Sequence, residues 1–201
     1  MPTRFLLSAV FLVFSVLAPP ASADEPVRDT DGNVLQRGVD YYIRPAVTDI
    51  GGGLTLDGRN GSCPLSVALA SLPADNGLPV QFSPEDDDDD DDTVELSTDT
   101  NVIFSASNIC VESTVWKVER DEGEGRDYVT IGGVAGNPGK ETLSNWFKIE
   151  SYQGVYKLVF CPTVCDYCRP VCGSLGVYEE GGRRWLGIRD DTPFPFEFKR
   201  A

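Results

Sequence analysis

Short runs of strand-forming residues, separated by glycine and proline, constrain the fold of this chain more than any other feature of its sequence. The chain has 20 glycines and 14 prolines, and its helical signal is poor. Runs rich in Val, Ile, Phe, Tyr and Leu recur at a spacing of roughly 8–15 residues, which is typical of an all-β barrel or sandwich. We predict about twelve strands. They are expected at residues 41–47, 54–56, 65–69, 94–96, 102–104, 115–119, 128–131, 146–150, 155–160, 176–178, 184–188 and 194–198.

The last of these runs alternates strictly. Phe194, Phe196 and Phe198 would share one face of a strand, because successive side chains of a strand point to opposite faces. We expect this strand to close a barrel with its aromatic face inward. Pro195 would suit an edge or rim position, since proline cannot donate a ladder hydrogen bond.

Internal repetition is faint. The tryptophan-containing segments 115–119, 146–150 and 185–189 look alike, but their unequal spacing does not give one period. Twelve strands could divide into three units of four, which the sequence alone does not establish.

The first 23 residues have the features of a secretory signal peptide. Arg4 supplies the positive charge, residues 5–17 form the apolar segment, and Ala-Ser-Ala at 21–23 is a cleavage site. The apolar segment is shorter than the about 20 residues that span a bilayer. We therefore expect a secreted protein, extracellular or vacuolar, in which residues 24–201 form one domain without a linker.

Charge and composition exclude several classes of function. The net charge is −15 and the chain has no histidine. Nucleic acids and anionic membranes bind basic patches, so we expect neither as a partner. A histidine base or histidine-based metal site is impossible, and the chain has no nucleophile elbow or phosphate loop. We expect no enzyme activity, no cofactor and no metal site, and a monomer as the state in solution.

Six cysteines behind a signal peptide indicate disulfides. The sequence alone leaves fifteen pairings open. A four-thiolate metal site is the rival interpretation of the last four cysteines, and secretion argues against it. Asn60-Gly61-Ser62 is an N-glycosylation sequon. The cysteines are Cys63, Cys110, Cys161, Cys165, Cys168 and Cys172.

Between Cys63 and Cys110 lies the most unusual stretch of the chain. Ser83, Pro84 and Glu85 are followed by seven aspartates, Asp86 to Asp92. Adjacent carboxylates repel one another and cannot be buried, so the run must be a solvated loop. Either the loop has no task, or it displays carboxylates to a partner. Any Ca²⁺ association would be loose, because the spacing is not that of an EF-hand.

Several motifs resemble one family. Val27-x-Asp29-x-x-Gly32-x-x-Leu35, followed by Tyr41-x-Ile43, resembles the N-terminal signature of the plant Kunitz (soybean trypsin inhibitor) family. Residues 156–162 and 172–173 resemble its C-terminal part. The segments 63–65 and 145–149 also fit the family pattern. The Cys-Pro-Thr-Val-Cys-Asp-Tyr-Cys sequence at 161–168 is similar to the miraculin-like branch.

This resemblance implies a β-trefoil, which is a six-stranded barrel capped by three hairpins. It also implies three disulfides: Cys63–Cys110, Cys161–Cys172 and Cys165–Cys168.

The resemblance further implies inhibition of a serine protease by one exposed loop between the first two cysteines. Ser83, Pro84 and Glu85 resemble the start of that loop, and the residue that enters the primary pocket of the protease would be Asp86 or Asp87. Trypsin inhibitors of this type place Arg or Lys there, because the trypsin pocket carries a carboxylate. An aspartate meets like charge in that pocket, so trypsin is not the expected target of this loop.

A second departure concerns the asparagine that packs inside the loop in family inhibitors. Arg37 occupies the matching position. Its charge allows the hypothesis that it pairs with the aspartates, and the alternative is a solvated Arg37.

Three interpretations of function remain. The protein could inhibit a protease that cleaves after aspartate. It could use another loop, with Lys140 or Arg183 and Arg184 as exposed turn cations. It could also be a non-inhibitory seed storage, defence or miraculin-like interaction protein.

Overall fold

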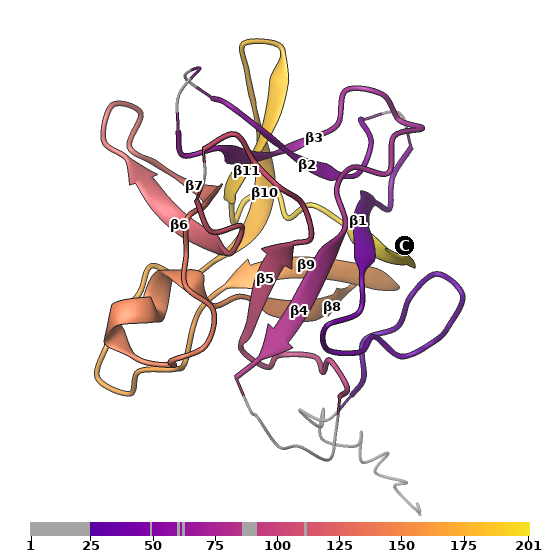
Figure 1. Ribbon diagram of the computed structural model, residues 1–201, viewed down its shortest axis with the longest axis horizontal. Coiled ribbons are helices and arrows are strands. Elements are labelled where there is room, and N and C mark those ends of the chain that lie inside the picture. The colour runs from indigo at the N-terminus through magenta and orange to yellow at the C-terminus, as the bar shows by residue number, and fades with distance from the viewer. Residues whose placement is uncertain (1–24, 49, 60, 62, 86–91, 111) are drawn as a thin grey trace, which may run out of the picture.

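Within the described part of the chain, twelve strands and one short 3-10 helix form the fold (Figure 1). The computed structural model describes residues 25–48, 50–59, 61, 63–85, 92–110 and 112–201. The predicted signal peptide, the predicted glycosylation site Asn60, and the predicted loop residues Asp86 and Asp87 lie outside these residues. The strands are β1 (Tyr41–Pro45), β2 (Leu54–Asp57), β3 (Ser66–Leu69), β4 (Val80–Pro84), β5 (Thr100–Phe104), β6 (Trp116–Asp121), β7 (Arg126–Ile131), β8 (Lys148–Tyr152), β9 (Val155–Phe160), β10 (Gly173–Glu180), β11 (Arg183–Ile188) and β12 (Phe196–Arg200), and the helix is η1 (Lys140–Asn145).

Six of the strands close a barrel. β1 pairs with β4 and β12, β4 with β5, β8 with β9, and β9 with β12, all antiparallel. The ring closes between β5 and the residue before β8, where Thr100 and Phe147 exchange backbone hydrogen bonds of 2.8 and 2.9 Å. Closure of the ring gives each of the six strands a neighbour on both sides, in some cases through a single residue pair such as Tyr41↔Val80 or Phe196↔Tyr156.

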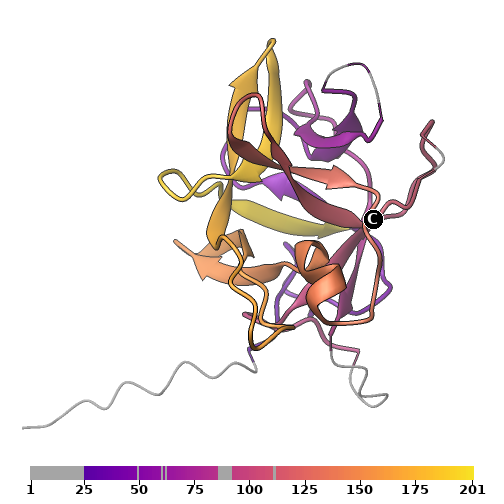
Figure 2. The same cartoon turned by 90° about the vertical axis from the view of Figure 1, so that its left-hand side faces the viewer.

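The other six strands form three hairpins, β2–β3, β6–β7 and β10–β11. One strand of each hairpin meets the others, through Ser66↔Thr130, Gly187↔Tyr128 and Trp185↔Ala68. The hairpins therefore cap one end of the barrel, and the β4–β5 connection lies at the other end (Figures 1 and 2). Each third of the chain supplies two barrel strands and one hairpin, which is a β-trefoil.

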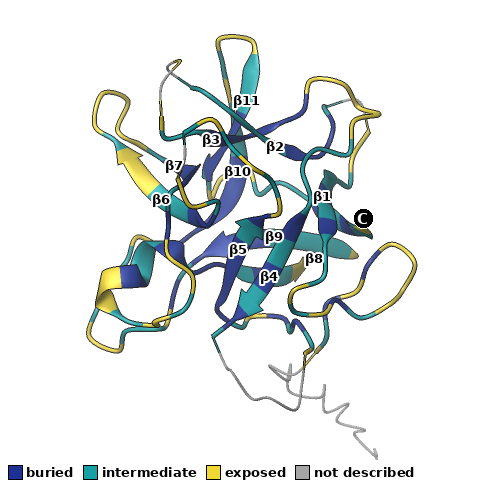
Figure 3. Cartoon of the chain, viewed as in Figure 1, coloured by how far each residue is buried: buried dark blue, intermediate teal, exposed yellow. Residues whose placement is uncertain are grey.

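Apolar side chains from all three units form one core cluster. Much of the buried part of the chain lies in the barrel strands (Figure 3). Phe196 and Phe198 are fully buried, as predicted for the inward face of the last strand, whereas Phe194 is half-buried. Phe82 from β4 meets Phe198 edge-to-face at 5.5 Å between ring centroids. Burial of such aromatic side chains dominates core energetics.

The structure corrects the predicted strand set in two places. Residues 94–96 form no strand, although Glu95 bridges Pro26 and the Val94 N–H donates to the Leu35 carbonyl. Strand β4, which the predicted set omits, pairs with β5 along its whole length. The three similar tryptophan segments are not equivalent, because Trp116 begins β6, Trp146 precedes β8 and Trp185 lies within β11.

Three disulfides link the loops, and their pairing is the one that the family resemblance implies. Cys63–Cys110 joins the segment before β3 to the loop after β5. Cys161–Cys172 and Cys165–Cys168 both lie in the connection between β9 and β10. This connection, residues 161–172, is called the stapled loop below.

Candidate functional site

The first candidate site is the connection between β4 and β5, which carries the acidic run. Strand β4 enters it, and its last two residues, Ser83 and Pro84, pair with Asn101 and Thr100 of β5. One step further, the backbone N–H of Glu85 donates to the carbonyl of Asp99 at 2.8 Å. The entry to the loop is therefore held by the barrel itself.

The return of the loop is fixed by the N-terminal segment. The backbone N–H of Arg37 donates to the carbonyl of Asp92 at 2.6 Å, and the next pair of residues, Gln36 and Thr93, forms a bridge. Val94 then donates to Leu35 at 2.9 Å. Both ends of the acidic run are thus anchored. The hypothesis of an ion pair between the Arg37 guanidinium and the acidic run stays a hypothesis, because residues 86–91 lie outside the described residues.

A buried carboxylate connects the base of this loop to the stapled loop. The Asp99 carboxylate accepts hydrogen bonds from the backbone N–H and the hydroxyl of Thr163, at 2.8 and 2.5 Å. Lys148 Nζ lies 3.6 Å from the same oxygen, and the Asp99 side chain is 1% exposed. The position of the loop entry therefore depends on a contact with residues 161–172.

Thr163→Val is expected to lower the free energy of unfolding by about 1.5 kcal/mol, because it removes a hydrogen bond to a buried charge. It should also speed proteolytic cleavage within the β4–β5 connection. Urea denaturation and limited proteolysis measure the two effects. Thr98→Val is the matched control, since the Thr98 hydroxyl makes only a 3.5 Å contact with Leu96. Equal effects of the two variants would contradict the role of Thr163.

The three predicted turn cations, Lys140, Arg183 and Arg184, differ in whether their charges are paired. Arg183 forms an ion pair with Asp57 and donates to the Ser71 hydroxyl at 2.5 Å. Arg184 donates to the Ile50 carbonyl at 2.7 Å and pairs with Glu179 at 3.0 Å. Both arginines lie at the start of β11, and their side chains are 31% and 38% exposed but ion-paired, so neither presents an unpaired charge within the described residues. Lys140 begins η1 and is exposed, with no hydrogen bond or ion pair among the described residues.

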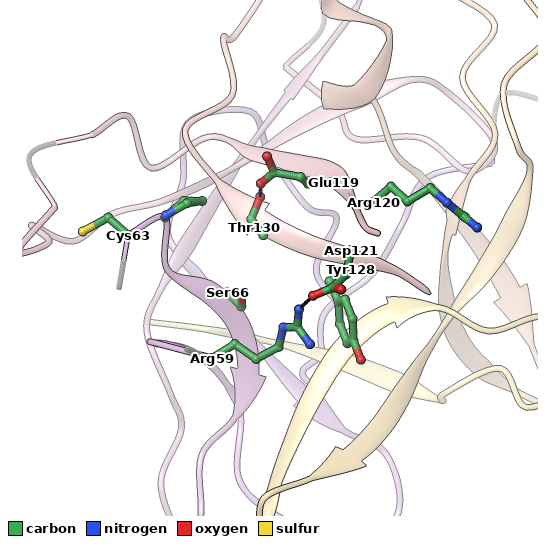
Figure 4. Close-up of a pocket in the computed structure, with 9 residues that line it drawn as sticks. Arg59, Cys63, Ser66, Glu119, Arg120, Asp121, Tyr128 and Thr130 are labelled. Carbon is green, nitrogen blue, oxygen red and sulfur yellow. Dashed lines mark hydrogen bonds and ion pairs between the residues drawn. The ribbon is translucent and has the colours of Figure 1, made fainter. Parts of the chain in front are cut away.

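A second candidate is a cavity of about 170 Å³ beside the first disulfide (Figure 4). Its wall includes Arg59, whose side chain is 9% exposed and forms ion pairs with Asp121, Glu180 and Glu124. The guanidinium also lies 3.9 Å from the centre of the Tyr128 ring, a cation–π arrangement. These contacts join the loop after β2 to the hairpins β6–β7 and β10–β11.

Burial and hydrogen bonding shift two pKa values in this cluster. Burial raises the pKa of Tyr128 to about 12. The Tyr128 hydroxyl donates to Glu124 at 2.6 Å, and this hydrogen bond is the main cause that lowers the pKa of Glu124. Because the carboxylates of Asp121, Glu124 and Glu180 already pair with Arg59, we interpret this cluster as structural. It links the loop after β2 to the ends of the β6–β7 and β10–β11 hairpins, and it is called the clasp below.

Tyr128 is expected to ionise at about pH 12 in the folded protein, against 10.0 for an unperturbed tyrosine. Because its pKa is raised by folding, its contribution to stability is complete below pH 10.0 and is lost as the pH rises through about 12. Tyrosinate absorbance during an alkaline titration measures the ionisation, and Tyr128→Phe identifies the step. If Tyr128→Phe removed tyrosinate absorbance that develops near pH 10 rather than near pH 12, the prediction would be wrong.

Two further features bear on function. In the described ranges, no group of three His, Cys, Asp or Glu side chains could hold a metal ion. In the same ranges, no helix has both the length and the apolar character that crossing a membrane requires.

The fold and the anchored loop define a disulfide-linked β-trefoil with a loop presented between two fixed ends. The sequence matches the family model described as "Trypsin and protease inhibitor", of the legume Kunitz type, over residues 27–200. The chain therefore belongs to the Kunitz family, whose members are inhibitors rather than enzymes.

Individual relatives cover nearly the whole chain. Miraculin from Synsepalum dulcificum is 45% identical, with 98% of this chain and 94% of that protein covered. Kunitz trypsin inhibitor 5 from Arabidopsis thaliana is 40% identical, with 98% and 96% covered. The structure of the bifunctional α-amylase/subtilisin inhibitor from rice, Oryza sativa, superimposes with a TM-score of 0.73 at 38% identity, and the match covers 89% of this chain and all of that one.

Proposed function

We propose that the protein is a secreted serine protease inhibitor whose β4–β5 loop binds a protease that cleaves after aspartate. One observation carries the proposal. The backbones of Glu85 and Asp92 are each fixed by a hydrogen bond, and every residue between them is an aspartate. Whichever residue of the run enters a primary pocket, it presents a carboxylate.

Anchored loop ends favour inhibition because they reduce the cost of binding. A loop that already has its bound shape loses little conformational entropy in the complex. The carboxylate then decides which pocket is acceptable. A pocket with its own carboxylate repels it, and a large apolar pocket leaves it unpaired. A pocket that pairs an aspartate with a cation or backbone N–H groups is the remaining class.

A non-inhibitory role in seed storage, defence or interaction with another protein is the second candidate. It is supported by Arg37, which stands where the family resemblance expects the asparagine that supports the loop. It is also supported by the 45% identity to miraculin, a relative whose name specifies no protease. A β-trefoil with three disulfides would suit storage without any active site.

An inhibition panel distinguishes the two candidates. The secreted protein, expected to begin at Asp24, is assayed against trypsin, chymotrypsin, subtilisin, an Asp-selective subtilase, papain and amylase. The proposal expects tight inhibition of the Asp-selective enzyme, which Asp86→Ala combined with Asp87→Ala weakens by about 100-fold. Lack of inhibition across the panel would favour the storage or interaction role.

A further inference from the structure

The loop between β7 and η1 is supported from inside by polar side chains. The Asn101 side-chain oxygen accepts a hydrogen bond from the backbone N–H of Gly136 at 2.7 Å. The Asn145 side-chain amide donates to the carbonyl of Val134 at 3.0 Å. The Thr142 hydroxyl donates to the carbonyl of Asn137 at 2.6 Å. Residues 134–140, called the β7–η1 loop, therefore have their backbone fixed at three points.

The supporting side chains are themselves held in place. Asn101 is 0% exposed, and its amide donates to the carbonyl of Asn145 at 2.9 Å. The Trp146 indole N–H donates to the Thr142 hydroxyl at 3.2 Å. A buried polar group that is fully hydrogen-bonded rigidifies its surroundings. The β7–η1 loop thus has, from Asn101 and Asn145, the internal asparagine support that the β4–β5 loop lacks at Arg37.

The outer side of the loop presents the side chain of Lys140. Val134 is 54% exposed, and Asn137, Pro138 and Lys140 are also exposed. Lys140 has no hydrogen bond or ion pair within the part of the chain that the structure describes, in contrast to Arg183 and Arg184. A fixed loop with an exposed ammonium group complements a cleft whose deepest pocket carries a carboxylate.

We propose that the β7–η1 loop is a second protease-binding surface, in which Lys140 enters the acidic primary pocket of a trypsin-like serine protease. This proposal rests on the function proposed above only in taking the protein to be a protease inhibitor. It uses another loop and a residue of opposite charge. Lys140 is the first residue of η1, and Thr142 N–H donates back to the Gly139 carbonyl at 3.3 Å. The Lys140–Glu141 peptide bond is therefore turned rather than extended, so Lys140 blocks the pocket without presenting a cleavable bond.

The test is the inhibition constant for trypsin, measured with the full mature protein. The wild type is expected to inhibit competitively. Lys140→Ala should weaken inhibition by about 100-fold, whereas Lys140→Arg should stay within about tenfold of the wild type. Lys199→Ala removes a cation from β12 and should change nothing. Mass spectrometry after long incubation should find the Lys140–Glu141 bond intact, and thermal melts verify that the variants are folded.

The outcomes separate this proposal from the function proposed above. Absence of trypsin inhibition by the wild type, or inhibition that Lys140→Ala leaves unchanged, would overturn the role of the β7–η1 loop. Cleavage at Lys140 would overturn the blocking mode. Inhibition of the Asp-selective protease that persists in Lys140→Ala would leave the β4–β5 proposal standing. If the Asp-selective protease is not inhibited but trypsin is inhibited in a Lys140-dependent way, only the β7–η1 loop acts as a protease-binding surface.

Discussion

Replacement of Asp86 or Asp87 by arginine is expected to strengthen trypsin inhibition through the β4–β5 loop by about a thousandfold. An aspartate can enter an acidic pocket only after protonation, which at pH 7 costs about 4 kcal/mol for a carboxyl group of ordinary pKa. Arginine removes this cost and adds an ion pair with the pocket carboxylate. Two variants are needed. Aligning the family's loop on Pro84 makes Asp86 the residue that enters the primary pocket, whereas an ungapped count from Cys63 makes it Asp87.

The measurement is the inhibition constant for trypsin in a Lys140→Ala background, so that the second surface does not contribute. Asp92→Arg is the matched control. It makes the same change of charge at the end of the run, where the backbone is already bonded to Arg37. A gain confined to one of the two test variants would identify the residue that enters the pocket. Equal gains in all three would show that only net charge matters, and no gain would show that the loop does not reach a protease pocket.

Most of the strands were predictable because each carries its own apolar signal. In β12, the alternation at Phe196 and Phe198 matches the two buried positions of the strand. In β4, Val80 and Phe82 are buried in the same alternation. That signal escaped prediction because the strand ends in proline and runs directly into the acidic tract. Residues 94–96 also alternate, but their neighbours pair with them only through single bridges.

The contacts that define the sites could not be predicted, because they join residues far apart in the sequence. Arg59 meets Asp121 across 62 residues and Glu180 across 121 residues. Asn101 supports Gly136 across 35 residues. No local pattern marks these partners, since the geometry exists only once the hairpins have met in the cap. That the aspartate run is solvated stays a prediction from its charge, because residues 86–91 lie outside the described residues.

Arg59→Ala is expected to lower the free energy of unfolding by about 3 kcal/mol. Removal of one partner of a buried ion pair leaves the others without compensation, which typically costs about 3–5 kcal/mol. The lower end applies because the side chains of Asp121 and Glu180 are 22% and 34% exposed, so water partly solvates them. The variant also loses the stacking of the guanidinium on Tyr128. For a domain of this size, the melting temperature should fall by about 6–12 °C.

Urea denaturation of Arg59→Ala and Arg120→Ala separates the clasp from ordinary surface charge. Arg120 is 52% exposed and pairs with Asp127 at 3.0 Å, so its loss should cost under about 1 kcal/mol. If the clasp holds the hairpins together, Arg59→Ala should also let the β6–β7 and β10–β11 hairpins exchange amide hydrogens faster. The β4–β5 ladder, at the far end of the barrel, should keep its protection. A loss confined to global stability, with equal exchange at both ends, would mean that Arg59 stabilises the whole barrel rather than its cap.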